Sequence, residues 1–158
     1  MDVIIEIPFG ENVKYELENG TLRCDRILNT SMVYPGNYGY LPDTLGKDGD
    51  ALDILLVNSE KLYPTTKIKS TIIGALEMED EAGIDHKLIA IPHESVSPHF
   101  DHIKNINHLQ PTLLDKIKHF FQHYKDNDSK KWSKVGNFIN KEKAFDIVKE
   151  GIELFKNK

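Results

Sequence analysis

The chain has 158 residues, of which 39% are hydrophobic and 28% are charged, a composition that predicts one globular domain spanning residues 1–158. No segment approaches 18 consecutive apolar residues and the N-terminal segment has no basic start, so we expect neither a membrane span nor a signal peptide. The net charge of −5 argues against a general nucleic-acid binder but leaves room for a small anionic ligand. The single cysteine, Cys24, excludes an internal disulfide and makes the cytoplasm the expected location.

The first part of the chain predicts three strands, at residues 3–8, 14–18 and 21–27. The dipeptide Asn19-Gly20 separates the second strand from the third, and this dipeptide favours a tight hairpin. The alternation of side chains along a strand places Lys14 and Glu16 on one face, while Arg26 lies near the far end of the partner strand.

Three tyrosines follow within seven residues, at Tyr34, Tyr38 and Tyr40, among prolines and glycines that mark turns. We expect an irregular segment here. The tyrosine rings can form the wall of a pocket, and their hydroxyl groups can donate hydrogen bonds to an anion.

The rest of the chain predicts strands at residues 53–57, 68–76, 87–92 and 130–135, and a short helix near 100–105. Apolar residues at helical spacing predict an amphipathic helix over 111–126 that starts with Pro111. Asn140 is expected to cap a last helix, whose buried side comprises Ala144, Val148, Ile152 and Phe155. Strands first and helices late indicate an α+β fold, namely a closed antiparallel β-barrel with two helices of the C-terminal half packed on it.

Three carboxylates, Asp48, Asp50 and Asp53, lie within six residues, and the last of them opens the apolar run 54–57. A charge at the start of a buried strand is costly unless it is neutralised, and a divalent cation is well suited to do so. The pattern does not fit a calcium-binding EF-hand, because Leu52 and Asp53 occupy the positions that require an oxygen ligand and a glycine.

A second acidic cluster follows the strand predicted at 68–76 and comprises Glu77, Glu79, Asp80, Glu81 and Asp85. Alone it would be interpreted as a solvated loop. Two such loops beside one small barrel can converge on a single site. Carboxylates without cysteine favour magnesium, manganese or calcium, and paired ions of this kind suit phosphoryl chemistry. His119 and His123 have the spacing of a zinc pair but lack the glutamate of that motif, so we expect a solvated or helix-capping pair.

Seven short motifs occur in one order between residues 3 and 135. They are Glu6-Ile7-Pro8, Lys14-Tyr15-Glu16, Asp25-Arg26, Tyr34-Pro35-x-Asn37-Tyr38-Gly39-Tyr40, Asp48-x-Asp50-x-x-Asp53, Asp80-Glu81-x-Gly83-x-Asp85-x-Lys87 and His119-Phe120-Phe121-x-His123-Tyr124-Lys125. Together they resemble the soluble family I inorganic pyrophosphatases of the short prokaryotic type.

The resemblance implies an OB-like five-stranded barrel, a homo-hexamer, and hydrolysis of pyrophosphate to two phosphates through in-line attack of a water activated by several Mg²⁺ ions. The implied metal ligands are Glu6, Asp48, Asp53, Asp80 and Asp85. Asp50 would accept the proton of the attacking water. The implied substrate-binding residues are Lys14, Arg26, Tyr38, Tyr124 and Lys125, with Lys87 beside them. The implied supporting residues are Glu16, Tyr34 and Glu81.

Two alternatives stay open at this level. One is a non-catalytic OB-type module for single-stranded nucleic acid, which the tyrosines would suit and the acidic loops oppose. The other is a metal-dependent phosphoesterase with a different substrate. Ala51 also departs from the family signature, which usually has Pro or Glu there, so we expect a looser acidic loop with its chemistry retained.

Overall fold

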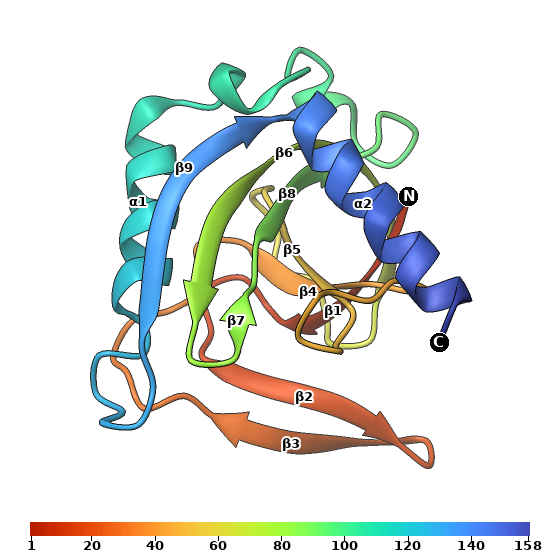
Figure 1. Cartoon of the computed structure of the whole chain (residues 1–158). Coiled ribbons are helices and arrows are strands. Elements are labelled where there is room, and N and C mark those ends of the chain that lie inside the picture. The colour runs from red at the N-terminus through yellow and green to blue at the C-terminus, as the bar shows by residue number, and fades with distance from the viewer.

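A computed structural model describes residues 1–158, and its central feature is a ring of five strands (Figure 1). Neighbouring strands pair in the order β1, β4, β5, β8 and β6, and pairing of β1 with β6 closes the ring. Their bounds are β1 Asp2–Ile7, β4 Asn37–Leu41, β5 Leu52–Leu56, β6 Lys67–Asp80 and β8 Lys87–Pro92. The predicted α+β fold with a closed five-stranded barrel is therefore confirmed.

One pair of barrel strands runs in the same direction. β5 and β8 are parallel, whereas the other pairs of the ring are antiparallel. The long strand β6 makes this possible, because it returns the chain along the barrel before β8 begins. We expected antiparallel pairing throughout, and hydrophobic periodicity carries no information on strand direction.

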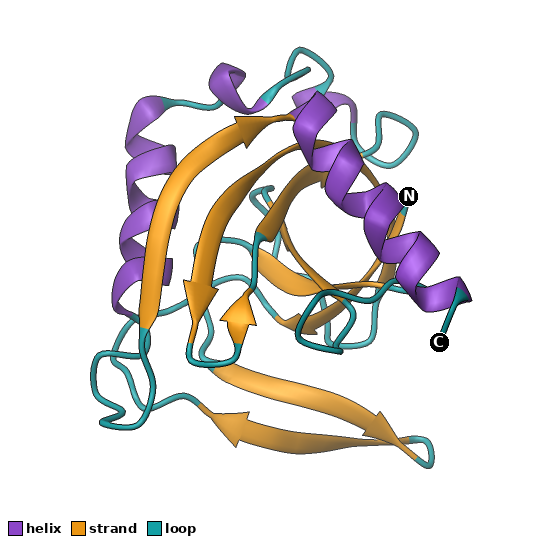
Figure 2. Cartoon of the chain, in the orientation of Figure 1, coloured by secondary structure: helices purple, strands orange, loops and turns teal.

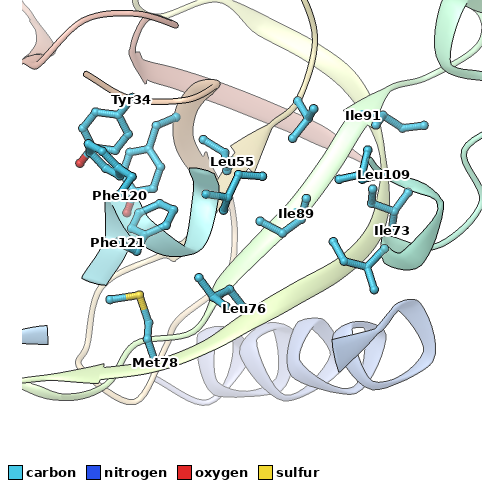
Figure 3. Packing of buried hydrophobic residues seen from close by; sticks show 14 of the residues in the cluster. Tyr34, Leu55, Ile73, Leu76, Met78, Ile89, Ile91, Leu109, Phe120 and Phe121 are labelled. Atoms are coloured by element: carbon cyan, nitrogen blue, oxygen red, sulfur yellow. The ribbon is translucent and has the colours of Figure 1, made fainter. Parts of the chain in front are cut away.

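Both faces of the barrel wall are buried, because each helix covers its own apolar cluster. The first cluster includes Ile89 and Leu55 and receives Phe121 from α1 (Figure 3). Ile117 of α1 belongs to the same cluster. The second cluster includes Ile54 and Leu88 of the same strands and receives residues of α2. Alternate residues thus enter different clusters, and this explains why β5 and β8 are continuous apolar runs in the sequence.

The helices are α1 (Pro111–His123) and α2 (Lys141–Lys156), and their starts agree with the prediction. Pro111 occupies the first turn of α1, and the side chain of Asn140 accepts a hydrogen bond from the backbone N–H of Lys143. The buried side of α2 contains Gly151, whereas Ile152 is only half-buried. Neither helix is long and apolar enough to cross a membrane.

Several predicted boundaries were wrong. Residues Asn37–Leu41 of the tyrosine-rich segment form the strand β4, because barrel pairing outweighs their turn-forming residues, whereas Tyr34 and Pro35 precede the strand and are irregular as expected. β6 extends to Asp80, so most of the second acidic cluster lies on a strand that turns back into β7 (Gly83–Ile84). The strand expected at 130–135 is β9 (Ser133–Asn140), which pairs with β6. Two 3-10 turns, η1 (Pro98–Phe100) and η2 (Ile106–His108), replace the short helix expected near 100–105.

The predicted hairpin is confirmed and forms a separate two-stranded sheet of β2 (Val13–Glu18) and β3 (Thr21–Ile27). Its turn residues Asn19 and Gly20 have positive φ angles of 52° and 81°, as a tight two-residue hairpin turn requires. Figure 2 shows the hairpin standing apart from the barrel, across the end at which β6 turns into β7.

Candidate active site

An open cleft of about 340 Å³ lies at the barrel end that faces the hairpin. Of the residues that the sequence analysis assigned to a site, all except Glu16 line this cleft. They are Glu6, Lys14, Arg26, Tyr34, Tyr38, Asp48, Asp50, Asp53, Asp80, Glu81, Asp85, Lys87, Tyr124 and Lys125. Glu16 lies beside the cleft on the hairpin, where it pairs with Arg23. The structure therefore brings together side chains from the barrel, the hairpin, the acidic loop and the end of α1.

The parallel pairing of β5 and β8 brings Asp53 and Lys87 together. Ile54 and Leu88 are partners in register, so the residues that precede them meet at the same end of the barrel. The Lys87 ammonium lies 2.6 Å from Asp53 Oδ2 and 2.8 Å from Asp85 Oδ2, and its side chain is only 2% exposed. A buried lysine with two carboxylates is a paired charge, which is the form in which proteins tolerate buried ions.

Aromatic rings surround this ion cluster. The Lys87 ammonium is 5.5 Å from the centre of the Tyr38 ring and 5.9 Å from that of Phe121, distances that suit a cation–π contact. Tyr34 packs between Tyr38 and Phe120. Burial raises the pKa of the Tyr34 and Tyr38 hydroxyls well above the ordinary value, so both remain hydrogen-bond donors at neutral pH.

A second ion cluster links the end of β6 with the end of α1. The Lys125 ammonium lies 2.9 Å from Asp80 Oδ2 and 3.4 Å from Glu81 Oε2. Burial would raise the pKa of Asp80, but hydrogen bonds from Lys125 and from the Ala82 backbone outweigh it and hold this pKa below the ordinary value. Glu81 also accepts a hydrogen bond from the backbone N–H of Trp132.

The hairpin contributes two cations that face each other across its strands. Lys14 pairs with Arg26, and an irregularity in the register adds one residue, Asp25, to β3 next to this pair. A bulge of this kind redirects side chains, and the Arg26 Nε donates to Asp25 at 2.8 Å. Like charges directly opposite each other destabilise a sheet. An anion bound in the cleft would therefore reduce the repulsion between Lys14 and Arg26 and stabilise the hairpin.

The acidic loop is shaped by its backbone. Gly49 has a φ of +88°, a conformation that favours glycine. The backbone N–H of Gly46 donates to the Asp50 carbonyl at 2.7 Å, and the backbone N–H of Asp50 donates to Asp48 Oδ1 at 3.1 Å. The Asp50 carboxylate itself makes no hydrogen bond or ion pair, unlike Asp53, Asp80 and Asp85.

Two carboxyl groups of the cleft have raised pKa values. Burial raises the pKa of Glu6 from 4.5 to about 7, with Asp53 adding to the shift and Lys14 opposing it. Burial likewise raises the pKa of Asp85 to about 7, where the repulsion from Asp53 works against the attraction of Lys87. Groups with shifted pKa values that share one cleft are typical of functional sites.

The charges of the cleft favour divalent cations. When all groups are ionised, eight carboxylates face five cations among the residues that line it, a net charge of −3. No three Asp, Glu, His or Cys side chains converge closely enough to hold an ion in this arrangement, because Lys87 and Lys125 occupy the space between the carboxylates. The ligand chemistry is nevertheless that of a hard cation, since the cleft offers many carboxylate oxygens and neither histidine nor cysteine.

Three polar residues of the cleft were missed by the sequence analysis, namely Asn29, Asp128 and Lys131. Asn29 follows the hairpin, and the other two lie in the loop after α1. Asn29 and Asn127 hold these two segments together, because each amide donates to the other's backbone carbonyl. No motif in the sequence distinguishes these residues from ordinary polar loop positions.

The same arrangement of fold and sequence is found in known proteins. The sequence model described as inorganic pyrophosphatase matches residues 3–156. The chain belongs to the inorganic pyrophosphatase family. The inorganic pyrophosphatase of Aquifex pyrophilus is 46% identical over 156 residues, covering 98% of this chain and 88% of its own. That of Nanoarchaeum equitans is 47% identical over 152 residues, covering 96% of this chain and 95% of its own.

Solved structures of inorganic pyrophosphatases share the fold. The Helicobacter pylori structure superposes with a TM-score of 0.94 at 42% identity, covering 99% of this chain and 93% of the other. The Thermus thermophilus structure superposes with a TM-score of 0.92 at 36% identity, covering 99% and 91%. The resemblance that the seven motifs indicated is thus confirmed.

Proposed function

We propose that this chain hydrolyses inorganic pyrophosphate to two phosphates with Mg²⁺ at the cleft described above. The observation that carries the magnesium requirement is the cleft's net charge of −3. A polyanion is repelled by such a cleft unless additional cations bind with it. Bound Mg²⁺ would supply that positive charge and would lower the pKa of a coordinated water. Glu6, Asp48, Asp53, Asp80 and Asp85 are the residues that would hold it.

The cations at the rim would bind and orient the substrate. Lys14 and Arg26 line the cleft from the hairpin, and Tyr124 and Lys125 line it from the end of α1. Pyrophosphate placed between them would meet positive charge on both phosphoryl groups. These groups would stabilise the charge that develops on the leaving phosphate, which is the main task of protein side chains in phosphoryl transfer.

Asp50 is the proposed proton acceptor. Lysines hold Asp53, Asp80 and Asp85, and a backbone N–H donates to Asp48. The carboxylate of Asp50 has no such partner, so it is free to accept a proton from the attacking water. Glu16, Tyr34 and Glu81 would support neighbouring groups.

Phosphate release from pyrophosphate tests this proposal. Release in millimolar Mg²⁺ and its loss in EDTA are expected. Asp50→Asn should lower kcat by about 10²–10⁴-fold, the range for loss of a general base, while Mg²⁺ binding measured by calorimetry is retained. The exposed α2 residue Asp146 provides the matched control Asp146→Asn, which should be fully active.

Two outcomes would contradict the proposal. Absence of phosphate release in Mg²⁺ would overturn the function, and full activity of Asp50→Asn would overturn Asp50 as the base. A panel of phosphate esters, assayed in parallel, distinguishes pyrophosphate hydrolysis from a general phosphoesterase activity.

We further propose that the chain acts as a single catalytic domain and assembles as a homo-hexamer in the cytoplasm. A groove beside α1 supports the assembly, since it is lined largely by apolar residues, including the half-exposed Val33. The exposed free thiol of Cys24 is consistent with a reducing compartment. Sedimentation analysis gives the number of subunits, and a species smaller than a hexamer would contradict that part.

A further inference from the structure

Helix α2 reaches the back of the acidic loop through a glycine. The backbone N–H of Leu45 donates to the carbonyl of Gly151 at 2.9 Å. The C-terminal half of α2 runs beside the segment that leads into β5 (Figure 1). The loop that carries Asp48 and Asp50 is therefore anchored to the backbone of a helix that contributes no side chain to the cleft.

A side chain at this position would force its surroundings to shift. A Cβ atom on residue 151 would lie 2.6 Å from Leu52 Cδ1, 3.1 Å from Leu52 Cγ and 3.2 Å from the carbonyl oxygen of Leu45. Glycine inside a helix costs about 0.5–1 kcal/mol relative to alanine. The helix accepts this cost at the point where Leu45 and Leu52 meet its backbone.

One other polar contact joins the loop to the helix. Lys47 and Glu150 form an exposed ion pair at 3.8 Å, which contributes little. A cavity of about 130 Å³ separates the rest of the loop from α2, and Asp53 and Asp85 form part of its wall. A contact concentrated at Gly151 thus sets how far the loop lies from the helix.

Hydrogen bonds at the base of the loop couple the position of Leu45 and Leu52 to that of the carboxylates. The buried Thr44 hydroxyl donates to the Leu41 carbonyl at 2.6 Å and accepts from the backbone N–H of Leu52 at 3.1 Å. These bonds tie the two ends of the loop together. A displacement of Leu45 or Leu52 therefore moves the loop between them, together with Asp53, which follows Leu52 directly.

We propose that Gly151 is a positioning residue for the acidic loop: the missing side chain lets α2 hold Asp48, Asp50 and Asp53 at the distance that Mg²⁺ binding and proton transfer require. This inference rests on the proposed Mg²⁺-dependent hydrolysis of pyrophosphate. A purely structural role for Gly151 would alter stability alone. A positioning role alters the Mg²⁺ dependence and kcat.

The test compares Gly151→Ala and Gly151→Leu with Lys149→Ala, an exposed position on the same helix. Displacement of catalytic groups by about 1 Å costs roughly 10²-fold in rate, so we expect kcat to fall about 10-fold for alanine and about 100-fold for leucine. Calorimetry should show weaker Mg²⁺ binding in both. Lys149→Ala should match the parent protein in both measurements. Tm in EDTA should remain within a few degrees for alanine, because the gain in helix propensity offsets part of the strain.

Leu52 provides a rescue experiment. In Gly151→Ala/Leu52→Ala the side chain that meets the new Cβ is absent, so the Mg²⁺ affinity lost by Gly151→Ala should be partly regained relative to Leu52→Ala alone. Unchanged Mg²⁺ affinity and kcat in Gly151→Ala, or a loss that the double variant does not reduce, would overturn the inference. An inactive parent protein would instead overturn the proposed function. The calorimetric comparison of Mg²⁺ binding could still be made in that case, because it does not depend on activity.

Discussion

Glu6 is a largely buried carboxyl group of the cleft that lacks a close cationic partner. Its side chain is 17% exposed and lies 3.9 Å from Lys14, too far for a strong ion pair. Burial raises its pKa from 4.5 to about 7. The folded protein therefore holds a proton at pH values where the unfolded chain has already released it.

This pKa shift makes the stability of the metal-free protein depend on pH. Because the native state binds more protons than the unfolded state, the free energy of unfolding should fall as pH rises from about 4.5 to 7 and then level off. Asp85, with a pKa of about 7, contributes in the same direction. Added Mg²⁺ should raise Tm more at pH 8 than at pH 5.5.

Thermal denaturation in EDTA across this pH range provides the measurement. Glu6→Gln should flatten the pH dependence, and Glu142→Gln, at an exposed position on α2, should leave it unchanged. A free energy of unfolding that rises between pH 5 and 7 in the metal-free parent protein would contradict the assigned cause.

At the scale of elements, the hairpin and the barrel divide the site between them. The barrel supplies carboxylates at its strand ends, and the hairpin supplies Lys14 and Arg26 on strands that form no sheet with the barrel. The hairpin therefore contributes two of the proposed substrate-binding residues and none of the proposed metal ligands. A local change in the hairpin should act on the substrate and spare the metal.

Gly20→Ala tests this division. No atom lies within 4 Å of a Cβ built at Gly20, so the φ of +81° is the only obstacle. A non-glycine residue in this region costs about 1–2 kcal/mol, and an equivalent loss of hairpin order would raise KM for pyrophosphate about 5- to 30-fold. Mg²⁺ affinity should be unchanged. Asn19→Gly, which keeps the turn conformation available, should leave KM near the parent value; a rise in the Mg²⁺ requirement of Gly20→Ala would contradict the division.

The elements also mark how far sequence reasoning reaches. Asn19-Gly20 and the periodicity of α1 were sufficient to place the hairpin and the helix, because local turn chemistry and a repeating apolar face determine them. β4 was not recognised, since Gly39 and its tyrosine neighbours are decided by barrel pairing. The direction of β5 relative to β8 depends on the path of β6 and cannot be read from either strand.

The candidate site followed a similar rule. The resemblance identified residues that occur in ordered motifs, and the fold brought them together. It gave no indication of Asn29, Asp128 or Lys131, whose positions result from loop geometry. The contact between Gly151 and Leu45 was also invisible, because it joins segments about a hundred residues apart through backbone atoms alone.

At the scale of the whole molecule, closure of the barrel depends on close passage of β1 over β4. A Cβ at Gly39 would lie 1.8 Å from the carbonyl oxygen of Ile4 and 3.0 Å from the Ile5 Cα. No side-chain adjustment relieves a clash with backbone. The ring of strands can close at this point only over a glycine.

Gly39→Ala should therefore destabilise the entire fold. We expect the free energy of unfolding to fall by about 4 kcal/mol or more, which is in the severe range for a single substitution. Gly136→Ala, where the nearest atom to the new Cβ is Glu77 Cβ at 3.3 Å, is the matched control in β9 and should cost far less. Urea denaturation in EDTA gives both values, and equal losses would contradict the close-passage explanation.

The shared register of Asp53 and Lys87 has a consequence for folding itself. A slip of one residue in β8 relative to β5 would turn the side chains of β8 to the opposite face of the wall. Lys87 would then be buried without a counter-charge, and removing the partner of a buried ion costs several kcal/mol. Mispaired barrels are thus penalised before any ligand is present. The Asp53–Lys87 pair therefore also favours the native register of β5 and β8 over a slip of one residue.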